Sequence, residues 1–273
     1  MIYVEAHGAR IPALGLGTFR LDGSLARRIV GYALEVGYRH IDTAQMYGNE
    51  TEVGAAIARS GVARDDIWLT TKIWPDEFRD GALQRAAETS VRRLGTVPDL
   101  LLLHWPNPSV PLAETMRALN EAKRRGLARH IGISNFTVAL IQEALARSDE
   151  PLIADQVEYQ PYLSQEAVLE ELRANGMALI AYSPLAQGRV FGDPTLARIG
   201  ERHGKSPGQV TLRWLIQQDG VAAIPRSSRE AHVKANFEIF DFALSDAEMA
   251  EIAALARPGG RRIDPAGMAP RWD

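Results

Sequence analysis

Residues 67–95 read IWLTTKIWPDEFRDGALQRAAETSVRRLG, an apolar run followed at once by a segment with a helical pattern. The run, Ile67–Trp74, has the length and the composition of a buried strand. Behind it, apolar residues spaced by three or four form one face of a helix: Leu83, Ala87, Val91 and Leu94. Gly95 follows, the residue type that best tolerates a left-handed helix end. This strand-and-helix unit decides the fold because it recurs along the chain.

Seven further apolar runs alternate with helical patterns: Ile11–Gly17, His40–Thr43, Leu100–Trp105, His130–Ser134, Ile153–Glu158, Ala178–Ser183 and Val221–Pro225. Such alternation is typical of parallel strands joined by helical crossovers. Eight units in 273 residues predict an α/β fold, a (β/α)8 TIM barrel, which takes about 250 residues. An open doubly wound sheet shows the same alternation and is the structural rival. No linker divides the chain, so we expect a single barrel domain over residues 1–273.

Two segments lie outside the eight units. Residues 1–10 predict an N-terminal β-hairpin that turns at His7-Gly8 and closes the bottom of the barrel. Near the other end of the chain, Ser245 and Glu248 have the spacing of a capping box and predict an extra C-terminal helix. The tail that begins at Arg257 is rich in Pro, Gly and Arg and predicts a loop over the barrel mouth.

Composition excludes several classes of function. Lys plus Arg number 31 and Asp plus Glu 34, a net charge of −3, which argues against nucleic acid or an anionic membrane as a partner. No apolar stretch approaches the roughly 18 residues of a spanning helix, and the N-terminus lacks the features of a secretory signal. The absence of cysteine excludes disulfides and thiolate chemistry, and no histidine pair has the spacing of a zinc helix, so we predict no metal. We expect a cytoplasmic protein, monomeric, acting on a small molecule.

Polar residues close the apolar runs, where a barrel places its active site. They are Asp42 with Tyr47 in the following loop, Lys72, His104, Ser134 and Asn135, Gln156 and Glu158, Tyr182 and Ser183, and Arg226 and Ser227. Each of them alone has a structural explanation, such as a turn former or a satisfied core histidine. Together, Asp, Tyr, Lys and His suit carbonyl reduction, because a carbonyl that accepts hydride needs a proton donor. An ammonium lowers the pKa of a neighbouring phenol, and a carboxylate holds the ammonium in place.

Residues 37–54, GYRHIDTAQMYGNETEVG, resemble the first signature of the aldo-keto reductase family. Later blocks resemble that family too: Thr-Thr-Lys72-Ile-Trp, Leu-Leu-His104-Trp-Pro, Gly132-Ile-Ser134-Asn135-Phe, Gln156-Val-Glu-Tyr, Tyr182-Ser-Pro-Leu185 and Ile224-Pro-Arg226-Ser227. The resemblance covers nearly the whole chain. It implies an NADPH-dependent oxidoreductase that reduces small aldehydes and ketones, of the 2,5-diketo-D-gluconate, methylglyoxal or β-keto ester type.

The resemblance also implies a role for each matching position. Tyr47 is the expected general acid, Lys72 and Asp42 tune it, and His104 orients the carbonyl. Ser134, Asn135 and Gln156 are expected to hold the nicotinamide carboxamide, with Tyr182 stacked on the ring. The remaining expected cofactor contacts are Gly17, Thr18, Phe19, Asp42, Ser183, Pro184, Leu185, Ile224, Pro225, Arg226, Ser227, His232 and Asn236. The expected substrate pocket consists of Phe19, Tyr47, Trp74, His104, Trp105 and Trp272.

The sequence departs from the family pattern where the adenosine phosphate is expected. The family usually has Lys at the position of Arg226 and Arg at the position of His232, so we expect a moderate preference for NADPH with NADH still usable. Arginines also crowd the tail, and we leave open whether Arg261, Arg262 and Arg271 are solvated or one receives a substrate carboxylate.

Two alternative functions remain open. The first is a Schiff-base aldolase that uses Lys72 as its nucleophile. The second is a non-catalytic, redox-sensing subunit of a larger assembly.

Overall fold

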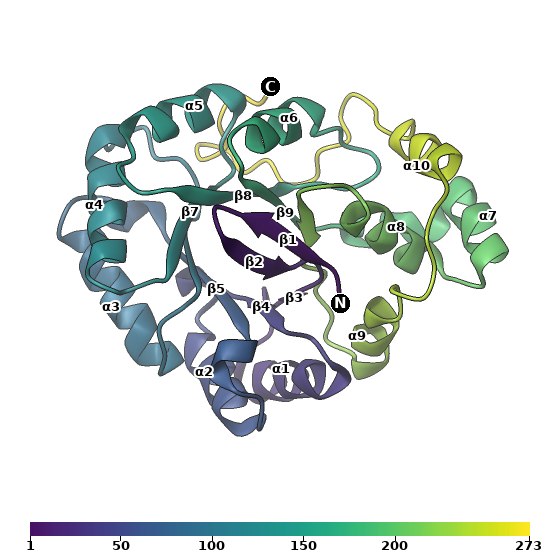
Figure 1. The fold of residues 1–273 in the computed structure, drawn as a ribbon, viewed down its shortest axis with the longest axis horizontal. Helices are drawn as coiled ribbons and strands as arrows, with labels where there is room; N and C mark the ends of the chain where they lie inside the picture. The colour runs from purple at the N-terminus through teal and green to yellow at the C-terminus, as the bar shows by residue number, and fades with distance from the viewer.

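The computed structural model describes all 273 residues and contains one sheet of eight parallel strands (Figure 1). Each strand pairs with the next one along the chain. The strands are β3 (Leu16–Gly17), β4 (His40–Asp42), β5 (Trp68–Ile73), β6 (Leu100–Leu103), β7 (His130–Ser134), β8 (Leu152–Glu158), β9 (Ala178–Tyr182) and β10 (Val221–Ala223). All but the first residue of β7 and the last of β9 are buried, as expected for a parallel sheet covered by helices.

The first and the last strand of the sheet meet and close it. Parallel bridges join Leu14 to Ala223 and Gly17 to Arg226, and the Gly15 N–H donates to the Ala223 carbonyl at 2.9 Å. A Cβ at Gly17 would lie 2.9 Å from the Ile224 carbonyl oxygen, so this close approach requires glycine. Closure confirms the predicted (β/α)8 barrel and rules out the open sheet.

A helix follows each strand and covers the outside of the barrel (Figure 1). The eight are α1 (Gly23–Val36), α2 (Glu50–Arg59), α3 (Ala82–Leu94), α4 (Leu112–Arg124), α5 (Val138–Arg147), α6 (Glu166–Ala174), α8 (Pro207–Ile216) and α9 (Glu230–Phe237). The extra helix α7 (Pro194–His203) explains the long interval before the last strand. Short 3-10 turns complete the loops: η1 (Gln45–Tyr47), η2 (Arg64–Asp66), η3 (Pro75–Glu77) and η4 (Ala186–Gly192). None of the helices is both long and apolar enough to span a bilayer.

The N-terminal hairpin is present and covers the end of the barrel where the strands begin (Figure 1). Its strands, β1 (Tyr3–Ala6) and β2 (Ala9–Pro12), pair antiparallel around the predicted turn. The Pro12 carbonyl lies 3.0 Å from Nδ1 of His40, the first residue of β4. The hairpin therefore closes the bottom of the barrel, as predicted.

One predicted strand boundary is wrong. We expected Ile11–Gly17 to be a single barrel strand, but Ile11 and Pro12 belong to the hairpin and the barrel strand is only Leu16–Gly17. The chain changes partner at Ala13, whose N–H donates to the Ile2 carbonyl while its own carbonyl accepts from the Ala223 N–H. A continuous apolar run carries no signal of such an exchange, because both partners are buried.

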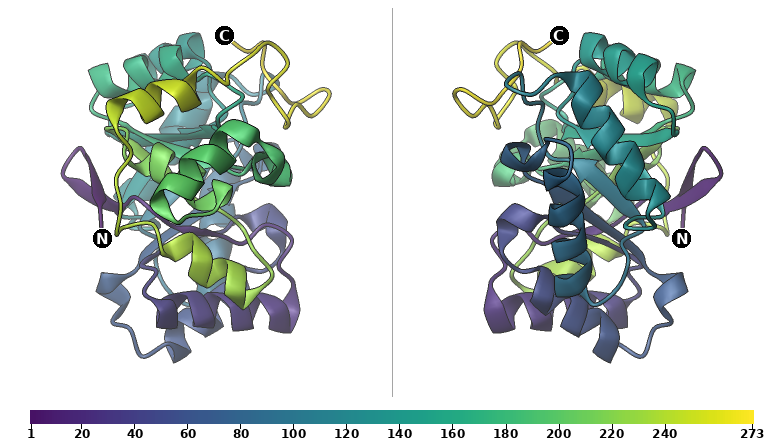
Figure 2. Two further views of the ribbon diagram at one scale, coloured as in Figure 1. Left: turned by 90° about the vertical axis from the view of Figure 1, so that its right-hand side faces the viewer. Right: turned by 90° about the vertical axis from the view of Figure 1, so that its left-hand side faces the viewer.

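The C-terminal additions are also present. Helix α10 (Asp246–Ala253) begins at Ser245, and Ser245 and Glu248 form the predicted capping box. The tail from Arg257 then crosses the barrel end opposite the hairpin (Figure 2). The tail therefore lies over the end at which the strands terminate.

Candidate active site

Four predicted residues, which we call the candidate tetrad, meet at the C-terminal ends of three neighbouring strands: Asp42, Tyr47, Lys72 and His104. Asp42 ends β4, Lys72 precedes the last residue of β5, and His104 directly follows β6. The Lys72 ammonium donates to Asp42 Oδ1 at 2.6 Å and to the Thr43 carbonyl at 2.8 Å. It lies 3.5 Å from the Tyr47 hydroxyl oxygen. The barrel thus connects carboxylate, ammonium and phenol in one chain of contacts.

The carboxylate–ammonium pair is almost completely withdrawn from water. The side chains of Lys72 and Asp42 are 1% and 2% exposed. The second carboxylate oxygen of Asp42 accepts from Gln156 Nε2 at 2.7 Å, so both oxygens are satisfied. Breaking a buried pair by removing one partner costs about 3–5 kcal/mol, because it leaves an uncompensated charge. The pair is therefore firmly fixed beside the phenol.

The pKa of Tyr47 differs from our expectation. We expected the Lys72 ammonium to lower it, but burial of the phenol, helped by the negative charge of Asp42, raises the pKa well above its ordinary value. The ammonium's shortest contacts are to Asp42 and Thr43, whose negative oxygens offset much of its electrostatic effect on the phenol. Burial also lowers the pKa of Lys72, and Asp42 opposes that shift. Tyr47 therefore keeps its proton in the resting site.

His104 is neutral and fixed by its surroundings. Burial, assisted by the positive charge of Lys72, lowers the pKa of its imidazole well below the ordinary value. Its ring lies edge-on to Tyr47 at 5.7 Å and to Trp74 at 5.3 Å between centroids. Nδ1 is buried without a hydrogen-bond partner, and a buried N–H without an acceptor is rarer than a bare acceptor, which favours the proton on Nε2. A neutral ring of this kind can donate one hydrogen bond.

A second group of predicted residues lies beside the tetrad at the ends of β7, β8 and β9. Asn135 Nδ2 donates to the His104 carbonyl at 3.0 Å and to Ser134 Oγ at 3.1 Å. The Tyr182 hydroxyl donates to Asn135 Oδ1 at 2.7 Å, which orients the half-buried Tyr182 ring. Asn135 has a φ of 65°, a left-handed conformation that Asn tolerates better than most residues. Gln156 Oε1 makes no hydrogen bond within the protein, so it remains available as an acceptor.

The predicted phosphate-binding residues Arg226, Ser227 and His232, which we call the phosphate end, lie farther along the rim; Ser227 is buried and the other two are exposed. Arg226 is exposed, and its guanidinium donates from Nε to the Phe19 carbonyl at 3.0 Å and from Nη2 to the Arg20 carbonyl at 2.7 Å. Ser227 Oγ accepts from the Arg229 N–H at 3.1 Å. His232 on α9 is exposed and makes no side-chain hydrogen bond. His232 can therefore move toward a ligand without breaking a hydrogen bond, whereas Arg226 would have to give up two.

The remaining predicted contacts occupy the same rim with different exposure. Ser183 has a φ of 48°, and Ser183, Pro184 and Leu185 link β9 to η4. Thr18 is buried and donates to the Asp42 carbonyl at 2.9 Å, so its hydroxyl is already used within the barrel. The other buried members of this set are Gly17, Ile224, Pro225 and Asn236.

Aromatic side chains surround the tetrad on its open side. Phe19 lies 5.1 Å from Tyr47, and Trp105 lies 6.2 Å from Trp272 of the tail, measured between ring centroids. Phe19 is 43% exposed, which leaves a large apolar surface beside the phenol. The structure thus brings all six predicted pocket residues to the mouth of the barrel.

The sequence model of the aldo/keto reductase family matches residues 13–257 of this chain. The chain belongs to the aldo/keto reductase family. It is 42% identical over 267 residues to the methylglyoxal reductase DkgB of Yersinia pestis, covering 96% of this chain and 99% of that protein.

Solved structures agree with this assignment. The crystal structure of a candidate 2,5-diketo-D-gluconic acid reductase B shares 52% identity and a TM-score of 0.98, covering 100% of this chain and 98% of the other. An aldo-keto reductase of Bombyx mori, solved in complex with NADP, shares 33% identity with a TM-score of 0.89, covering 96% of this chain and 95% of the other. The chain is therefore an oxidoreductase that reduces carbonyl groups.

Two features of this aldo/keto reductase site were missed at the sequence level. The Thr43 carbonyl, an anchor of Lys72, is a backbone atom and leaves no trace in the residue pattern. Arg229 is exposed at the start of α9, two residues beyond Ser227, and its guanidinium has no partner. Its positive charge, three residues after Arg226, was the signal that could have found it.

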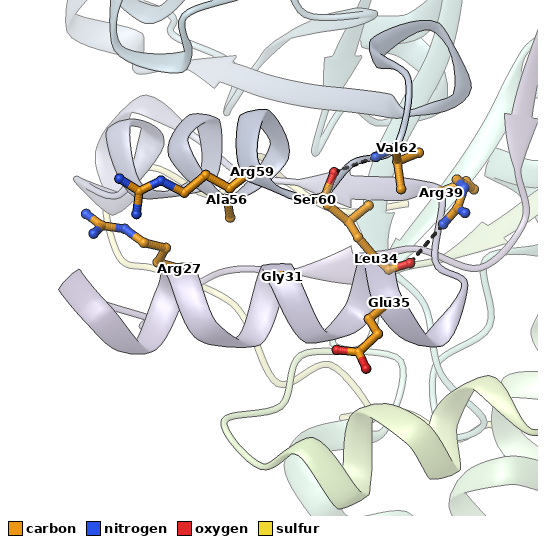
Figure 3. Close-up of a pocket in the computed structure, with 9 residues that line it drawn as sticks. All are labelled: Arg27, Gly31, Leu34, Glu35, Arg39, Ala56, Arg59, Ser60 and Val62. Atoms are coloured by element: carbon orange, nitrogen blue, oxygen red, sulfur yellow. Dashed lines mark hydrogen bonds between the residues drawn. The ribbon is translucent and has the colours of Figure 1, made fainter.

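Two pockets of the reductase lie away from the tetrad. One, of about 560 Å³, is an open groove between α1 and α2 on the outside of the barrel (Figure 3). It is lined by Arg27, Leu34 and Arg59 among others, and Figure 3 shows the two arginines extending along it. Another, of about 530 Å³, lies under the hairpin at the bottom of the barrel. Neither contains a residue of the tetrad.

Proposed function

We propose that this aldo/keto reductase reduces small aldehydes and ketones with NADPH, with Tyr47 as the general acid. The observation that carries this proposal is the chain of contacts from Asp42 through Lys72 to the Tyr47 hydroxyl, with neutral His104 beside the phenol. Together these groups offer what a carbonyl needs when hydride reaches its carbon, namely a proton and a hydrogen-bond donor for its oxygen.

When bound, a reduced nicotinamide would supply the hydride to the carbonyl carbon. As negative charge develops on the carbonyl oxygen, the Tyr47 hydroxyl donates its proton and His104 Nε2 donates a hydrogen bond. Because burial holds the pKa of Tyr47 high, the acid is fully protonated at neutral pH. The ammonium of Lys72 then stabilises the phenolate left after the proton has moved, and Asp42 keeps that ammonium in place.

The residues present fit a nicotinamide dinucleotide. The free Gln156 Oε1 suits the N–H₂ group of a carboxamide, and the Tyr182 ring is held in position by Asn135. At the phosphate end, Arg226 uses only two of its five N–H groups on backbone carbonyls and keeps donors for a phosphate. The guanidinium geometry suits bidentate phosphate binding, which supports NADPH over NADH.

Names of similar proteins indicate the substrate class. The Yersinia pestis relative is named a methylglyoxal reductase, and the structural neighbour a 2,5-diketo-D-gluconic acid reductase. We propose small dicarbonyls, keto-sugar acids or β-keto esters as substrates of this chain. A cytoplasmic location, a monomeric state and a single domain over residues 1–273 stay predictions.

The geometry disfavours a Schiff-base aldolase. Such chemistry needs Lys72 free of a carboxylate, but its ammonium is bound to Asp42 at 2.6 Å. Failure of borohydride to trap a carbonyl compound on the protein would exclude the aldolase. The alternative hypothesis of a redox-sensing subunit predicts that the protein is inactive as a reductase and co-purifies with a partner.

The test is oxidation of NADPH or NADH, followed by absorbance, with methylglyoxal, 2,5-diketo-D-gluconate, a β-keto ester and an aromatic aldehyde. Tyr47→Phe removes the acid but keeps the aromatic wall, so turnover should fall at least about 100-fold while NADPH affinity barely changes. Tyr3→Phe, an exposed tyrosine of the hairpin at the opposite end of the barrel, is the matched control. Near-normal turnover in Tyr47→Phe would overturn the assignment of the acid.

A further inference from the structure

The tail is fastened to the end of β8 by a buried carboxylate. Glu158, the last residue of β8, accepts backbone N–H bonds from Arg262 at 2.9 Å to each oxygen and from Ile263 at 2.7 Å. The Gly260 carbonyl accepts from Gln160 Nε2 at 2.9 Å. These bonds fix the backbone on both sides of Arg261 and therefore determine where its side chain lies.

The Arg261 guanidinium lies over the mouth of the barrel. Its central carbon is 3.5 Å from the centroid of the Trp272 ring, and Trp272 packs against Trp105, the residue after His104. Tyr182 lies within electrostatic range of both Arg261 and Tyr47. A cation held flat on an aromatic ring keeps its planar set of donors in a fixed orientation.

This guanidinium has no protein partner for any of its N–H groups. It makes no hydrogen bond and no ion pair within 4.0 Å, and Nη1 is buried and unpaired. Three carboxylates are close enough to interact with its charge: Glu158, Asp264 and Asp273. Each of them accepts a hydrogen bond from another group. Glu158 binds the tail backbone, Asp264 accepts from Trp272 Nε1 at 2.8 Å, and Asp273 accepts from the Val138 N–H at 2.9 Å.

Charge elsewhere at the mouth does not replace this group. The ammonium of Lys72 is buried and paired with Asp42. The walls of the pocket are the aromatic residues Phe19, Trp74 and Trp105. Arg20 lies over the Phe19 ring, with its guanidinium carbon 5.1 Å from the ring centroid, but it is exposed to solvent. For a substrate whose carbonyl lies at Tyr47, Arg261 is the cation at the mouth that holds a buried, unpaired donor. The surrounding carboxylates weaken long-range attraction, so discrimination depends on a direct two-point contact, which a carboxylate provides.

We propose that Arg261 receives the carboxylate of carbonyl substrates that carry one, and so selects keto and aldehyde acids over neutral carbonyl compounds. This inference rests on the proposed reductase function. A hydrogen bond to a charged group changes affinity by about 10- to 150-fold, which sets the expected size of the selection. Arg262 and Arg271 are exposed and make no side-chain contact of this kind.

The test compares the semialdehydes of succinic, glutaric and adipic acid with their methyl esters, which differ mainly in charge. In the wild-type enzyme, kcat/KM should favour the acid of at least one chain length over its ester. Arg261→Gln should reduce that acid-to-ester ratio about 10-fold or more, mainly through KM. Arg262→Gln removes an equal charge one residue away and should keep the wild-type ratio. If Arg261→Gln changes acid and ester equally, the residue only builds the wall and the proposal is wrong.

Two further measurements separate the remaining outcomes. Fluorescence titration with NADPH reports whether the anion is instead a cofactor phosphate: weaker NADPH binding in Arg261→Gln with an unchanged acid-to-ester ratio overturns the proposal. Calorimetric titration with glutarate needs no turnover. If the wild type reduces none of the aldehydes but binds glutarate, and Arg261→Gln abolishes that binding while the protein stays folded, the reductase function fails and the carboxylate site stands.

Discussion

At the tetrad end of the site, Lys72 and Asp42 are buried, paired and at most 2% exposed, whereas at the phosphate end Arg226, Arg229 and His232 are exposed. The tetrad end is thus fixed by contacts within the protein, while the Arg229 and His232 side chains make no hydrogen bond or ion pair. Proton transfer requires positions held to within fractions of an ångström, since misplacement is costly to rate. Phosphate recognition depends on charge and tolerates motion. Substitutions should therefore affect rate at one end and affinity at the other.

The largest effect is expected from Lys72→Met. It leaves Asp42 buried without its cation and removes the group that stabilises the phenolate, so most activity should be lost and stability should fall by about 3–5 kcal/mol. Turnover and thermal unfolding measure the two effects. Adding Asp42→Asn should recover much of the stability but none of the rate. A single variant that retains its rate while gaining activity at alkaline pH would mean that another group is the acid.

Arg226→Ala tests the phosphate end. Removing the guanidinium should weaken NADPH binding by about 10- to 150-fold, the value of a hydrogen bond to a charged group, and leave NADH nearly unchanged. Equilibrium titration of both cofactors measures the difference, and kcat at saturating NADPH should stay close to that of the wild type. Equal affinity of the wild-type enzyme for NADPH and NADH would show that Arg226 makes no phosphate contact.

Asp155 on β8 is an exception at the buried end, because neither of its oxygens has a hydrogen-bond partner of good geometry. Burial raises its pKa well above the ordinary value, although the N–H groups of Phe136 and Asn135 oppose the shift. The folded protein then holds a proton that the unfolded chain releases above about pH 4, so stability declines as pH rises toward the folded-state pKa. Each pKa unit corresponds to about 1.4 kcal/mol.

Asp155→Asn removes this ionisation with almost no change of shape. The variant should unfold at a higher temperature than the wild type at neutral pH, by roughly 2–4 °C per kcal/mol for a chain of this size. The difference should shrink as the pH falls toward 4, where both proteins are uncharged at this position. Identical unfolding temperatures at neutral pH would contradict the raised pKa.

His232→Arg should have the smallest effect. A permanent cation at this exposed position can stack on an adenine ring, a contact worth about 0.5–1 kcal/mol at exposed sites, so NADPH affinity should rise two- to five-fold by that estimate. The affinity for NADPH, measured by equilibrium titration, is the readout. An unchanged NADPH affinity would place His232 outside the cofactor site.

The difference between the two ends also explains what the sequence could predict. Asp42, Lys72 and His104 were predictable because strand ends in a barrel converge, whatever the details of the loops. The raised pKa of Tyr47 was not predictable, since it depends on how completely the loops bury the phenol. The contacts of Arg226 with the Phe19 and Arg20 carbonyls and of Glu158 with the tail backbone were equally hidden, because they join segments far apart in the sequence. The misplaced first strand has the same cause, an exchange of partners within one apolar run.

The closure between β3 and β10 has a mechanical consequence. Two bridged pairs join the segments of these strands, as few as join β3 to β4, whereas the other neighbouring strands of the barrel pair over longer ladders, such as β8 with β9. Arg226, which follows β10, reinforces this closure by donating to the Phe19 and Arg20 carbonyls. A phosphate that drew the guanidinium away from these two carbonyls would remove a contact between the first and the last strand segments, so cofactor binding would loosen the barrel at its closure. Hydrogen exchange at the Gly15 and Gly17 amides, which donate across this closure, should then become faster when the cofactor binds.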